Sequence, residues 1–472
     1  MSTEFSSTTS GGISRHALEA FRRSVRGPVL QAGDEGYDDV RSVWNGMIDR
    51  RPAVIVRCLG PADVIAAVNF AREQGLGASV RCGGHNVAGT AVADGALMID
   101  LSLMRGIRVD AKARTVRAQG GARWTDVDRE TQVFGLATPS GYVSETGIGG
   151  FTLGGGYGAL RRKHGMTCDS LISADIVTAD GNLRVASETE NEDLFWALRG
   201  GGGNFGVVTS FEYRSYPVGP MVFLCIPFYP LETAGEVIRA WREFMKSAPE
   251  EISSNVMFWS IPAIPEFPEQ FHNRPVVSTM CMYPGDPAEG ERITLPMRRF
   301  AKPLIDLSSS TTYVRVQSQY DFLFPPRSRR YYLKSIDLLE LTDACIDRIV
   351  SIGTERPNHD TAVPIWHFGG AMSRVDPTAT AFWRRQTPYM VSVDAIWRDA
   401  ADDHKVRAWT RAAIDSLREF SDGGEYVNFP GLAEDGEAQV RAGYGGNYER
   451  LKAIKRKYDP ENLFRYNVNI KP

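Results

Sequence analysis

A lone histidine that follows two glycines is the first feature of the sequence that could carry chemistry. His85 comes directly after Gly83 and Gly84, at the end of a strand expected up to Arg81. Glycines at that point let the backbone approach something flat and bulky, with the histidine facing it. The same short pattern is also typical of a tight turn followed by a polar surface histidine. The rest of the chain has to distinguish the two readings.

The densest glycine region, residues 141–158, has too few side chains to build a core. Its backbone N–H groups could bind an anion such as a diphosphate, and a flexible loop is the alternative. Residues 201–206 match the dinucleotide fingerprint GxGxxG literally, and residues 154–159 match its alanine variant. Neither has the preceding strand and following apolar helix that the fingerprint requires, so a nicotinamide or flavin Rossmann domain is disfavoured.

The elements that must position these residues indicate an α+β fold. Short strands are expected at residues 53–57, 97–101, 107–110 and 115–119, with helices at 61–75 and 124–134. The regular strand and helix alternation of a doubly wound sheet is missing. A strand pair should turn at Asp180-Gly181. From residue 221 the aromatic and proline content rises, which indicates a second domain with an antiparallel sheet and helices on one face.

Composition excludes several functional classes. The 54 basic and 57 acidic residues are interspersed, so no basic face for nucleic acid is expected. The chain has no apolar run long enough to span a membrane, and residues 1–12 are expected to be a disordered tail without a secretion signal. The 6 cysteines and 7 histidines are scattered, which favours a reducing, cytoplasmic compartment without a metal site.

Several motifs, taken together and in order, resemble one family. They are the strand that ends in Cys82-Gly83-Gly84-His85-Asn86, the loops at 146–150 and 154–158, the runs at 168–171 and 203–209, and the polar, aromatic run at 458–470. This set resembles the berberine-bridge-enzyme-like branch of the vanillyl-alcohol-oxidase flavoproteins. The resemblance covers nearly all of the chain after residue 40.

That resemblance implies a PCMH-type FAD-binding domain of two α/β subdomains and a substrate domain over the isoalloxazine. We therefore expect an N-terminal extension at 1–40, the FAD domain at 41–218, the substrate domain at 219–424, and a C-terminal segment at 425–472 that returns to the FAD domain. The residues expected to bind FAD on this basis are Arg81, Cys82, Gly83, Gly84, His85, Asn86, Gly89, Thr146, Gly147, Gly149, Gly150, Gly154, Gly156, Tyr157, Gly158, Asp169, Asn204, Gly206, Val207, Asn467 and Asn469.

By the same analogy His85 carries the flavin covalently through the 8α-methyl group. A neutral imidazole is a good nucleophile near neutral pH, and such a tether makes the flavin a stronger oxidant. Many members of the family have a second tether, a cysteine at the position that is Val143 here. We therefore expect a single bond through His85, with Cys168 as a buried structural thiol.

The family's base position falls on the strand at residues 389–397, where Met390, Ser392, Asp394 and Ile396 should share one face. The resemblance points to Ser392, with Tyr444 nearby. Serine is a poor base, so Asp394 is expected to pair with Tyr444 and ionise it, although a solvated aspartate is an equal alternative. The candidates for lining the substrate site are Tyr142, Trp366, His367, Gln317 and Tyr320.

The resemblance implies an oxidase that moves hydride from a CH–OH or CH–NH carbon of a small aromatic, alkaloid-like or carbohydrate molecule to flavin N5. Oxygen would then reoxidise the flavin and give hydrogen peroxide. An oxidative cyclase of secondary metabolism and a non-catalytic flavin-binding protein remain alternatives. The chain is expected to act as a monomer or homodimer, with a small-molecule substrate and O2 as its partners.

Overall fold

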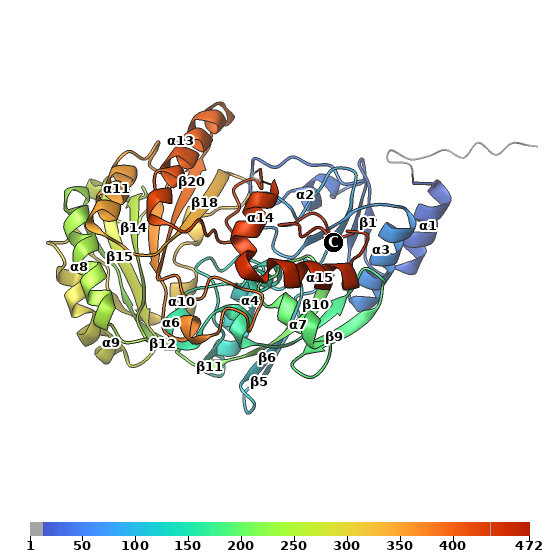
Figure 1. The fold of residues 1–472 in the computed structure, drawn as a ribbon, viewed down its shortest axis with the longest axis horizontal. Helices are drawn as coiled ribbons and strands as arrows, with labels where there is room; N and C mark the ends of the chain where they lie inside the picture. Colours follow the sequence, from blue (N-terminus) through green and yellow to red (C-terminus); the bar gives the residue numbers. More distant parts are fainter. Residues whose placement is uncertain (1–12, 435) are drawn as a thin grey trace, which may run out of the picture.

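The computed structural model describes residues 13–434 and 436–472, so the tail expected at residues 1–12 lies outside the described part. Within that part, strands form a four-stranded, a five-stranded and a nine-stranded sheet and one two-stranded ladder. Figure 1 shows the nine-stranded sheet and its helices at one end of an elongated molecule and the smaller sheets toward the other. Helices and several separate sheets in this arrangement confirm the α+β fold class.

The four-stranded sheet carries the start of the glycine and histidine motif. Three of its strands are parallel to one another, and an antiparallel strand lies at one edge. Pro61 begins the connecting helix at a position where a proline needs no hydrogen-bond donor. Phe21 stacks on Phe70 and so packs the first helix against that connecting helix. The order is β1 (Val29–Leu30), β2 (Val54–Arg57), β4 (Leu97–Asp100) and β3 (Ala78–Arg81), with helices α1 (Arg15–Ser24), α2 (Tyr37–Arg41) and α3 (Pro61–Glu73).

The five-stranded sheet is antiparallel and supports the glycine-rich loops. Its hairpin turns at Asp180-Gly181, as expected from the sequence. The order is β5 (Ile107–Asp110), β6 (Thr115–Gln119), β10 (Val207–Arg214), β8 (Leu171–Val177) and β9 (Leu183–Ser187). The nearby elements are α4 (Trp124–Gln132), α5 (Ile148–Leu153), α6 (Arg161–His164), α7 (Glu192–Leu198) and the ladder of β7 (Leu136–Ala137) with β11 (Tyr216–Pro217).

The nine-stranded sheet is antiparallel, and helices α8 (Ala234–Ser247), α11 (Asp343–Thr354) and α13 (Asp403–Asp415) cover one of its faces. Its main path runs through β16 (Ile305–Asp306), β13 (Pro227–Pro230), β15 (Pro275–Tyr283), β14 (Ser253–Ser260), β19 (Val363–His367), β20 (Tyr389–Trp397) and β18 (Arg330–Leu338). Strands β12 (Met221–Cys225) and β17 (Ser309–Thr312) pair beside this path, and the short helices are α9 (Pro287–Thr294), α10 (Tyr313–Gln317) and α12 (Ala371–Arg374).

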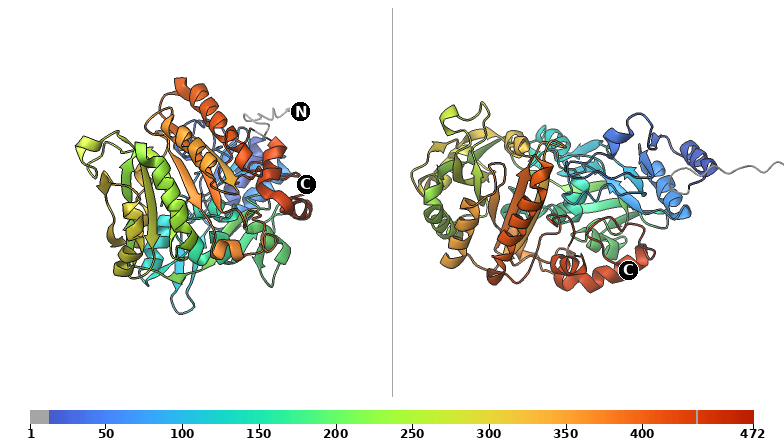
Figure 2. Two further views of the ribbon diagram at one scale, coloured as in Figure 1. Left: turned by 60° about the vertical axis from the view of Figure 1, so that its left-hand side comes forward. Right: turned by 90° about the horizontal axis from the view of Figure 1, so that it is seen from above.

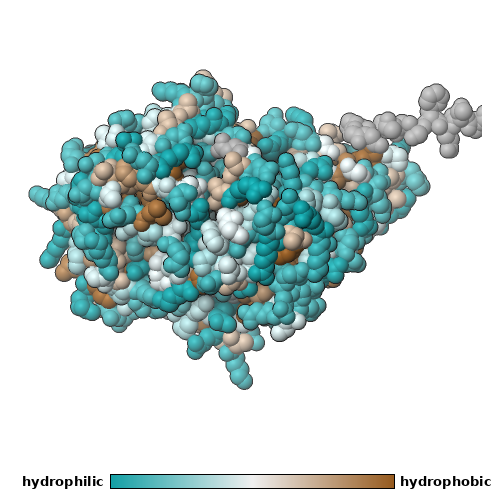
Figure 3. All heavy atoms as spheres, in the orientation of Figure 1, coloured by the Kyte–Doolittle hydropathy of each residue, from teal (hydrophilic) through white to brown (hydrophobic). Residues whose placement is uncertain are grey.

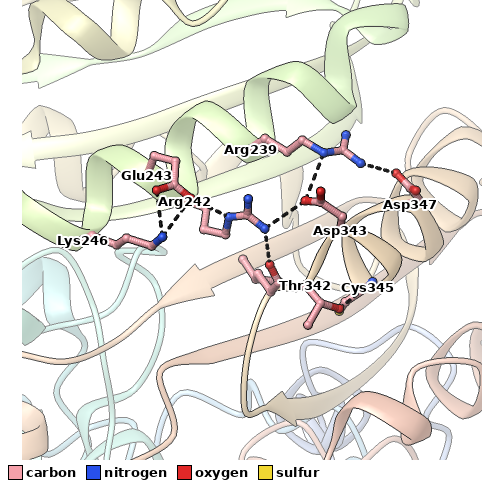
Figure 4. Close-up of polar contacts among 9 residues, drawn as sticks. Arg239, Arg242, Glu243, Lys246, Thr342, Asp343, Cys345 and Asp347 are labelled. Carbon is pink, nitrogen blue, oxygen red and sulfur yellow. Dashed lines mark hydrogen bonds and ion pairs between the residues drawn. The ribbon is translucent and has the colours of Figure 1, made fainter.

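Ion pairs hold α8 and α11 side by side on the outside of this sheet (Figure 4). Arg239 contacts Asp343 at 3.2 Å and Asp347 at 2.6 Å, and Arg242 contacts Asp343 at 3.1 Å. The two aspartates are mostly exposed, so water and salt screen these pairs and each contributes little to stability. Apolar burial beneath the helices, including Trp241 and Ile349, supplies the main stabilisation.

Alternation along the strands separates the helix-covered core from the opposite face of this sheet. In β14, Val256 and Phe258 pack in the core under the helices, whereas Asn255, Met257 and Trp259 face the other way. That second face looks toward the half of the molecule that carries the glycine-rich loops. A site between the two halves can therefore draw residues from both.

The C-terminal segment returns to that half through α14 (Gly436–Tyr444) and α15 (Tyr448–Tyr458) (Figure 2). Lys455 and Asp459, both fully buried, form an ion pair of 2.6 Å. The Lys455 ammonium also donates to the carbonyl oxygen of Asn204, which anchors the helix to the loop before β10. The segment boundaries expected at residues 41, 219 and 425 stay predictions.

The face seen in Figure 3 is mostly hydrophilic, with small and separated apolar areas. In the described residues no helix combines the length and apolar character needed to cross a membrane. The same residues contain no group of three or more histidine, cysteine, aspartate or glutamate side chains arranged to hold a metal ion.

Candidate active site

A cavity of about 390 Å³ lies between the two halves of the molecule. One wall consists of the end of β3, the glycine-rich loops and the C-terminal segment. The opposite wall is the free face of the nine-stranded sheet, with Trp366 of β19 and Asp394 of β20. The cavity therefore brings His85 and Asp394, which are distant in sequence, to one site.

His85 lies on the cavity wall, with its imidazole stacked on the indole of Trp44 at 5.2 Å between ring centroids. Among the described residues, no hydrogen-bond partner occupies its ring nitrogens. Burial, together with the smaller effect of the positive charges of Arg123 and Arg81, lowers the imidazole pKa to about 3. The ring is therefore neutral at physiological pH, as a nucleophilic imidazole must be.

Glycines allow two loops to meet behind His85. A Cβ atom at Gly83 would lie 2.4 Å from the backbone nitrogen of Gly147, so no other residue fits at Gly83 without movement. In contrast, a Cβ at Gly150 or Gly203 would meet no atom within 4 Å. The open space beside these two glycines belongs to the cavity wall and leaves room for a large ligand to lie against the backbone.

More than half of the residues expected to bind FAD line this cavity. They are Cys82, Gly83, Gly84, His85, Asn86, Thr146, Gly147, Gly149, Gly150, Gly154, Tyr157, Gly206 and Asn467. The residues that the structure does not bring to the wall are Arg81, Gly89, Gly156, Gly158, Asp169, Asn204, Val207 and Asn469. Several of these support the wall from behind. Asn204, for example, donates to the carbonyl oxygen of Val468 and accepts from the backbone N–H of Ile470.

The glycine-rich region is more ordered than a flexible loop. Helix α5 lies within it, and Arg161 and Arg162 in the following α6 are buried rather than solvated. The backbone carbonyl oxygens of Pro249 and Ile252 accept hydrogen bonds from Arg162. This charged run therefore joins the loop to the nine-stranded sheet. The sequence did not indicate that role, because the run has no apolar helical face.

Val143 lies on the cavity wall with His85, whereas Cys168 does not. Cys168 is fully buried, and Arg385 donates to its sulfur at 3.8 Å. Burial raises the Cys168 thiol pKa to about 12, so the reactive thiolate form is disfavoured. Cys82 does line the cavity, but burial raises its pKa to about 11 and its thiol contacts the carbonyl oxygen of Ala122 at 3.4 Å.

The opposite wall presents Asp394 among aromatic rings. The alternation expected for β20 is present, because Asp394 and Ile396 face the cavity while Val393 and Ala395 pack in the core under the helices. Burial raises the Asp394 carboxyl pKa to about 7, and a hydrogen bond from Ser392 opposes that shift. A carboxylate that titrates near neutral pH is suited to accept a proton from a substrate. Of the predicted substrate residues, Tyr142, Tyr320 and Trp366 line this chamber.

Three predicted site residues lie away from the cavity wall. Ser392 is buried, and its hydroxyl accepts from the Trp366 indole at 3.3 Å. Gln317 donates to the carbonyl oxygen of Gly141 at 2.9 Å and so supports the wall from behind. His367 follows the β19 alternation onto the helix-covered face, where its ring contacts Trp241 and Tyr389. These placements do not bring the three side chains to a substrate.

The expected pair of Tyr444 and Asp394 is not present. Tyr444 lines the cavity, but its hydroxyl contacts the carbonyl oxygens of Gly201 at 3.1 Å and Val468 at 3.2 Å. Since a tyrosine hydroxyl has one hydrogen to donate, those carbonyls take it. Tyr444 therefore links the C-terminal segment to the glycine loop and does not hydrogen-bond to Asp394.

Tyr426 is a cavity tyrosine that sequence reasoning missed. Its hydroxyl accepts from the backbone N–H of Gly156 at 3.2 Å and from the Asn428 amide at 2.9 Å. Both contacts use the oxygen as acceptor, so the hydroxyl hydrogen stays available. The Tyr426 ring centroid lies 5.0 Å from that of Tyr157. Burial raises the pKa of Tyr157, and the negative charge of Asp394 contributes to that increase. All four residues of the run Tyr426-Val427-Asn428-Phe429 line the cavity. In the sequence, this run of aromatic and polar residues is the feature that could have indicated Tyr426 as a site residue.

Comparison with known proteins identifies the family. A family model described as an FAD binding domain matches residues 52–187, and a model described as berberine and berberine like matches residues 425–471. An FAD-linked oxidoreductase of Dictyostelium discoideum is 33% identical over 460 residues, which cover 96% of this chain and 97% of that protein. The chain belongs to the berberine-bridge-enzyme-like FAD-linked oxidoreductases. Its cofactor is FAD.

Two solved structures extend the similarity to the whole fold. Within the family the motifs point to 6-hydroxy-D-nicotine oxidase. The crystal structure of that enzyme from Arthrobacter nicotinovorans is 28% identical, with a TM-score of 0.84 over 95% of this chain and 98% of that one. A chitooligosaccharide oxidase is 26% identical, with a TM-score of 0.84 over 97% of this chain and 99% of that one. The enzyme is thus an FAD-linked oxidase of this family.

Proposed function

We propose that this enzyme oxidises a CH–OH or CH–NH carbon of a small organic molecule and uses O2 as the final electron acceptor. The observation that carries the proposal is the single cavity that holds both His85 and Asp394. One similar protein is named for oxidation of a hydroxynicotine and another for oxidation of a chitooligosaccharide. Both substrate classes therefore belong in the first screen.

His85 is the proposed covalent attachment point of FAD. The imidazole faces the cavity, is neutral, and has no hydrogen-bond partner among the described residues. Val143 supplies no thiol for a second bond. When bound, FAD supplies the acceptor for the substrate hydride and passes the electrons to O2 to give hydrogen peroxide.

Asp394 is the proposed base for an alcohol substrate. As hydride leaves the carbon, the hydroxyl proton moves to the Asp394 carboxylate, so that a carbonyl product forms. Its pKa of about 7 provides a substantial carboxylate fraction near neutral pH. Tyr426 has a free hydroxyl hydrogen and can orient the substrate oxygen. A neutral amine needs no such base, because the nitrogen lone pair drives hydride loss.

Oxygen uptake tests this function directly. The purified holoenzyme is supplied with panels of aromatic secondary alcohols, cyclic amines and oligosaccharides, and both oxygen loss and peroxide formation are followed. We expect one panel to give turnover with one peroxide per oxygen consumed. An alcohol substrate should lose at least about 100-fold in kcat/KM in Asp394→Asn, whereas an amine substrate should not. Absence of turnover with every panel would contradict the oxidase function and favour a flavin-binding protein.

The structure of the product separates simple oxidation from oxidative cyclisation. Both reactions remove two hydrogens, so their products have the same mass unless an imine is hydrolysed. Simple oxidation gives a new carbonyl or imine carbon, whereas cyclisation gives a new ring bond, and the NMR spectrum of the product distinguishes the two.

A further inference from the structure

Arg161 is a fully buried cation with no carboxylate partner. Its side chain has 0% exposure, and among the described residues no acidic group lies within ion-pair distance. The other fully buried arginine, Arg385, differs because Asp169 pairs with it at 2.7 Å. A buried charge without a counterion is costly, so the contacts that Arg161 does make indicate its purpose.

Backbone carbonyls and one hydroxyl take the hydrogen bonds of Arg161. The guanidinium donates to the carbonyl oxygens of His367 at 2.9 Å, Gly158 at 3.0 Å and Ser254 at 2.6 Å. It also donates to the Tyr142 hydroxyl at 2.7 Å. These contacts join the glycine loop, β14 and β19, and the Tyr142 hydroxyl is the only side-chain acceptor among them. Tyr142 is thus held at the junction of the two halves.

The contact with Arg161 determines what the Tyr142 hydroxyl can do. A guanidinium has donors only, so the Tyr142 oxygen must accept, and its own hydrogen must point elsewhere. No acceptor among the described residues takes that hydrogen, and Tyr142 lines the cavity. Burial raises the Tyr142 pKa despite the opposing effect of Arg161, so the hydroxyl stays protonated near neutral pH. Tyr142 is therefore a donor.

Aromatic rings surround Tyr142 on the cavity wall. The Tyr142 ring makes an angle of 39° with Trp366 and 61° with Tyr320, and Tyr157 makes 68° with Trp366. All four rings line the cavity, so a flat molecule bound there packs against aromatic side chains. The guanidinium of Arg161, which lies behind the cavity wall, is 5.8 Å from the Trp366 ring centroid.

We propose that Tyr142 is the hydrogen-bond donor that selects the substrate, a flat ring carrying an acceptor oxygen or nitrogen, and that Arg161 is the positioning residue that aims it. This inference rests on the proposed function only in taking the cavity as the substrate site. Among aromatic, alkaloid-like and carbohydrate molecules, the inference favours aromatic molecules that carry a hydrogen-bond acceptor.

A matched pair of ring compounds tests the proposal without turnover. Acetophenone carries one carbonyl acceptor, and α-methylstyrene has the same shape with a methylene in place of the oxygen. Their dissociation constants are measured on the holoenzyme through the change in visible flavin absorbance. In Tyr142→Phe the preference for acetophenone over α-methylstyrene should fall about tenfold relative to wild type. Tyr283→Phe, which removes a hydroxyl elsewhere in the sheet, should leave the preference unchanged.

Arg161→Met tests the positioning role. It should lower the same preference, and the double variant with Tyr142→Phe should show no further loss, because Arg161 acts through Tyr142. Incorporated 3-fluorotyrosine gives a second readout, with the Tyr142 resonance assigned by its absence in Tyr142→Phe. Acetophenone should shift that resonance in wild type and not in Arg161→Met.

An unchanged preference in Tyr142→Phe would overturn the proposal, as would failure of acetophenone to perturb the wild-type flavin spectrum. If Arg161→Met does not fold, Tyr142→Phe and the fluorine shift still decide the role of Tyr142. Acetophenone binding does not depend on turnover, so failure of the oxidase function would appear separately, in the oxygen-uptake screen.

Discussion

The imidazole of His85 lies nearly parallel to the indole of Trp44, with an interplanar angle of 14°. The other face of Trp44 stacks on Tyr331 of β18 at 3.7 Å between centroids, and its indole N–H donates to the carbonyl oxygen of Phe324. The nine-stranded sheet and its neighbouring loop thus fix the ring against which the proposed attachment point rests. The orientation of His85 depends on both halves of the molecule.

Replacement of Trp44 should impair covalent attachment of the flavin. In Trp44→Ala the imidazole loses its stacking partner, and we expect attachment of added FAD to the apoprotein to slow by at least about tenfold. Trp44→Phe keeps an aromatic face and should recover most of the rate. The measurement is the time course of acid-stable flavin, with Trp409→Phe in α13 as a control far from the cavity. Equal rates in Trp44→Ala and wild type would show that stacking does not orient His85.

Asp394 should control how alcohol oxidation depends on pH. Its pKa of about 7 means that the carboxylate, the form that accepts a proton, predominates only above neutral pH. We expect kcat/KM for an alcohol to rise with pH through about 7 in wild type and to lack this rise in Asp394→Asn. Asp337 is the matched control, since burial raises its pKa to about 7 as well but it lies outside the cavity lining. Asp337→Asn should keep the pH profile.

The same carboxyl should affect stability in the opposite direction. The folded-state pKa is raised, so the protonated form is favoured by folding, and that contribution is lost as pH rises from about 4 to about 7. Relative to wild type, Asp394→Asn should therefore be more stable at pH values above 7 than at acid pH. Urea unfolding at several pH values measures this difference. A pH-independent difference would contradict the raised pKa.

Two lysines of α15 offer a matched stability test. Lys455 pairs with Asp459 where both are fully buried, whereas Lys457 pairs with Asp193 where the two side chains are 59% and 35% exposed. Lys455→Met leaves a buried carboxylate unpaired, so we expect a loss of about 3–5 kcal/mol in unfolding free energy. Lys457→Met should cost about 1 kcal/mol or less. Urea unfolding compares the two, and equal losses would mean that the buried pair does not anchor the C-terminal segment.

Local periodicity explains what the sequence could predict. The face shared by Asp394 and Ile396 follows from the two-residue period of a strand, and the Pro61 helix start follows from proline stereochemistry. The same period, applied to β19, would have placed His367 opposite Trp366 and away from the cavity.

Contacts between distant segments determine the features of the site that the sequence could not predict. The hydrogen bond from the Gly156 N–H to Tyr426 joins positions 270 residues apart, and the Arg161 contact with Ser254 joins positions 93 apart. No local pattern encodes either contact. Only the folded chain therefore shows that Tyr426 lines the cavity and that Arg161 is a buried charge. It also shows that the Tyr444 hydroxyl binds backbone carbonyl oxygens and not Asp394.

Acid precipitation of the purified holoenzyme, followed by mass mapping of the flavin-bearing peptide, tests the proposed attachment most directly. We expect the yellow colour to stay with the pellet, on a peptide that contains His85 and on none that contains Cys168. His85→Ala should release the colour to the supernatant while the protein can still bind FAD. Colour wholly in the supernatant of the wild-type protein would contradict the covalent link through His85.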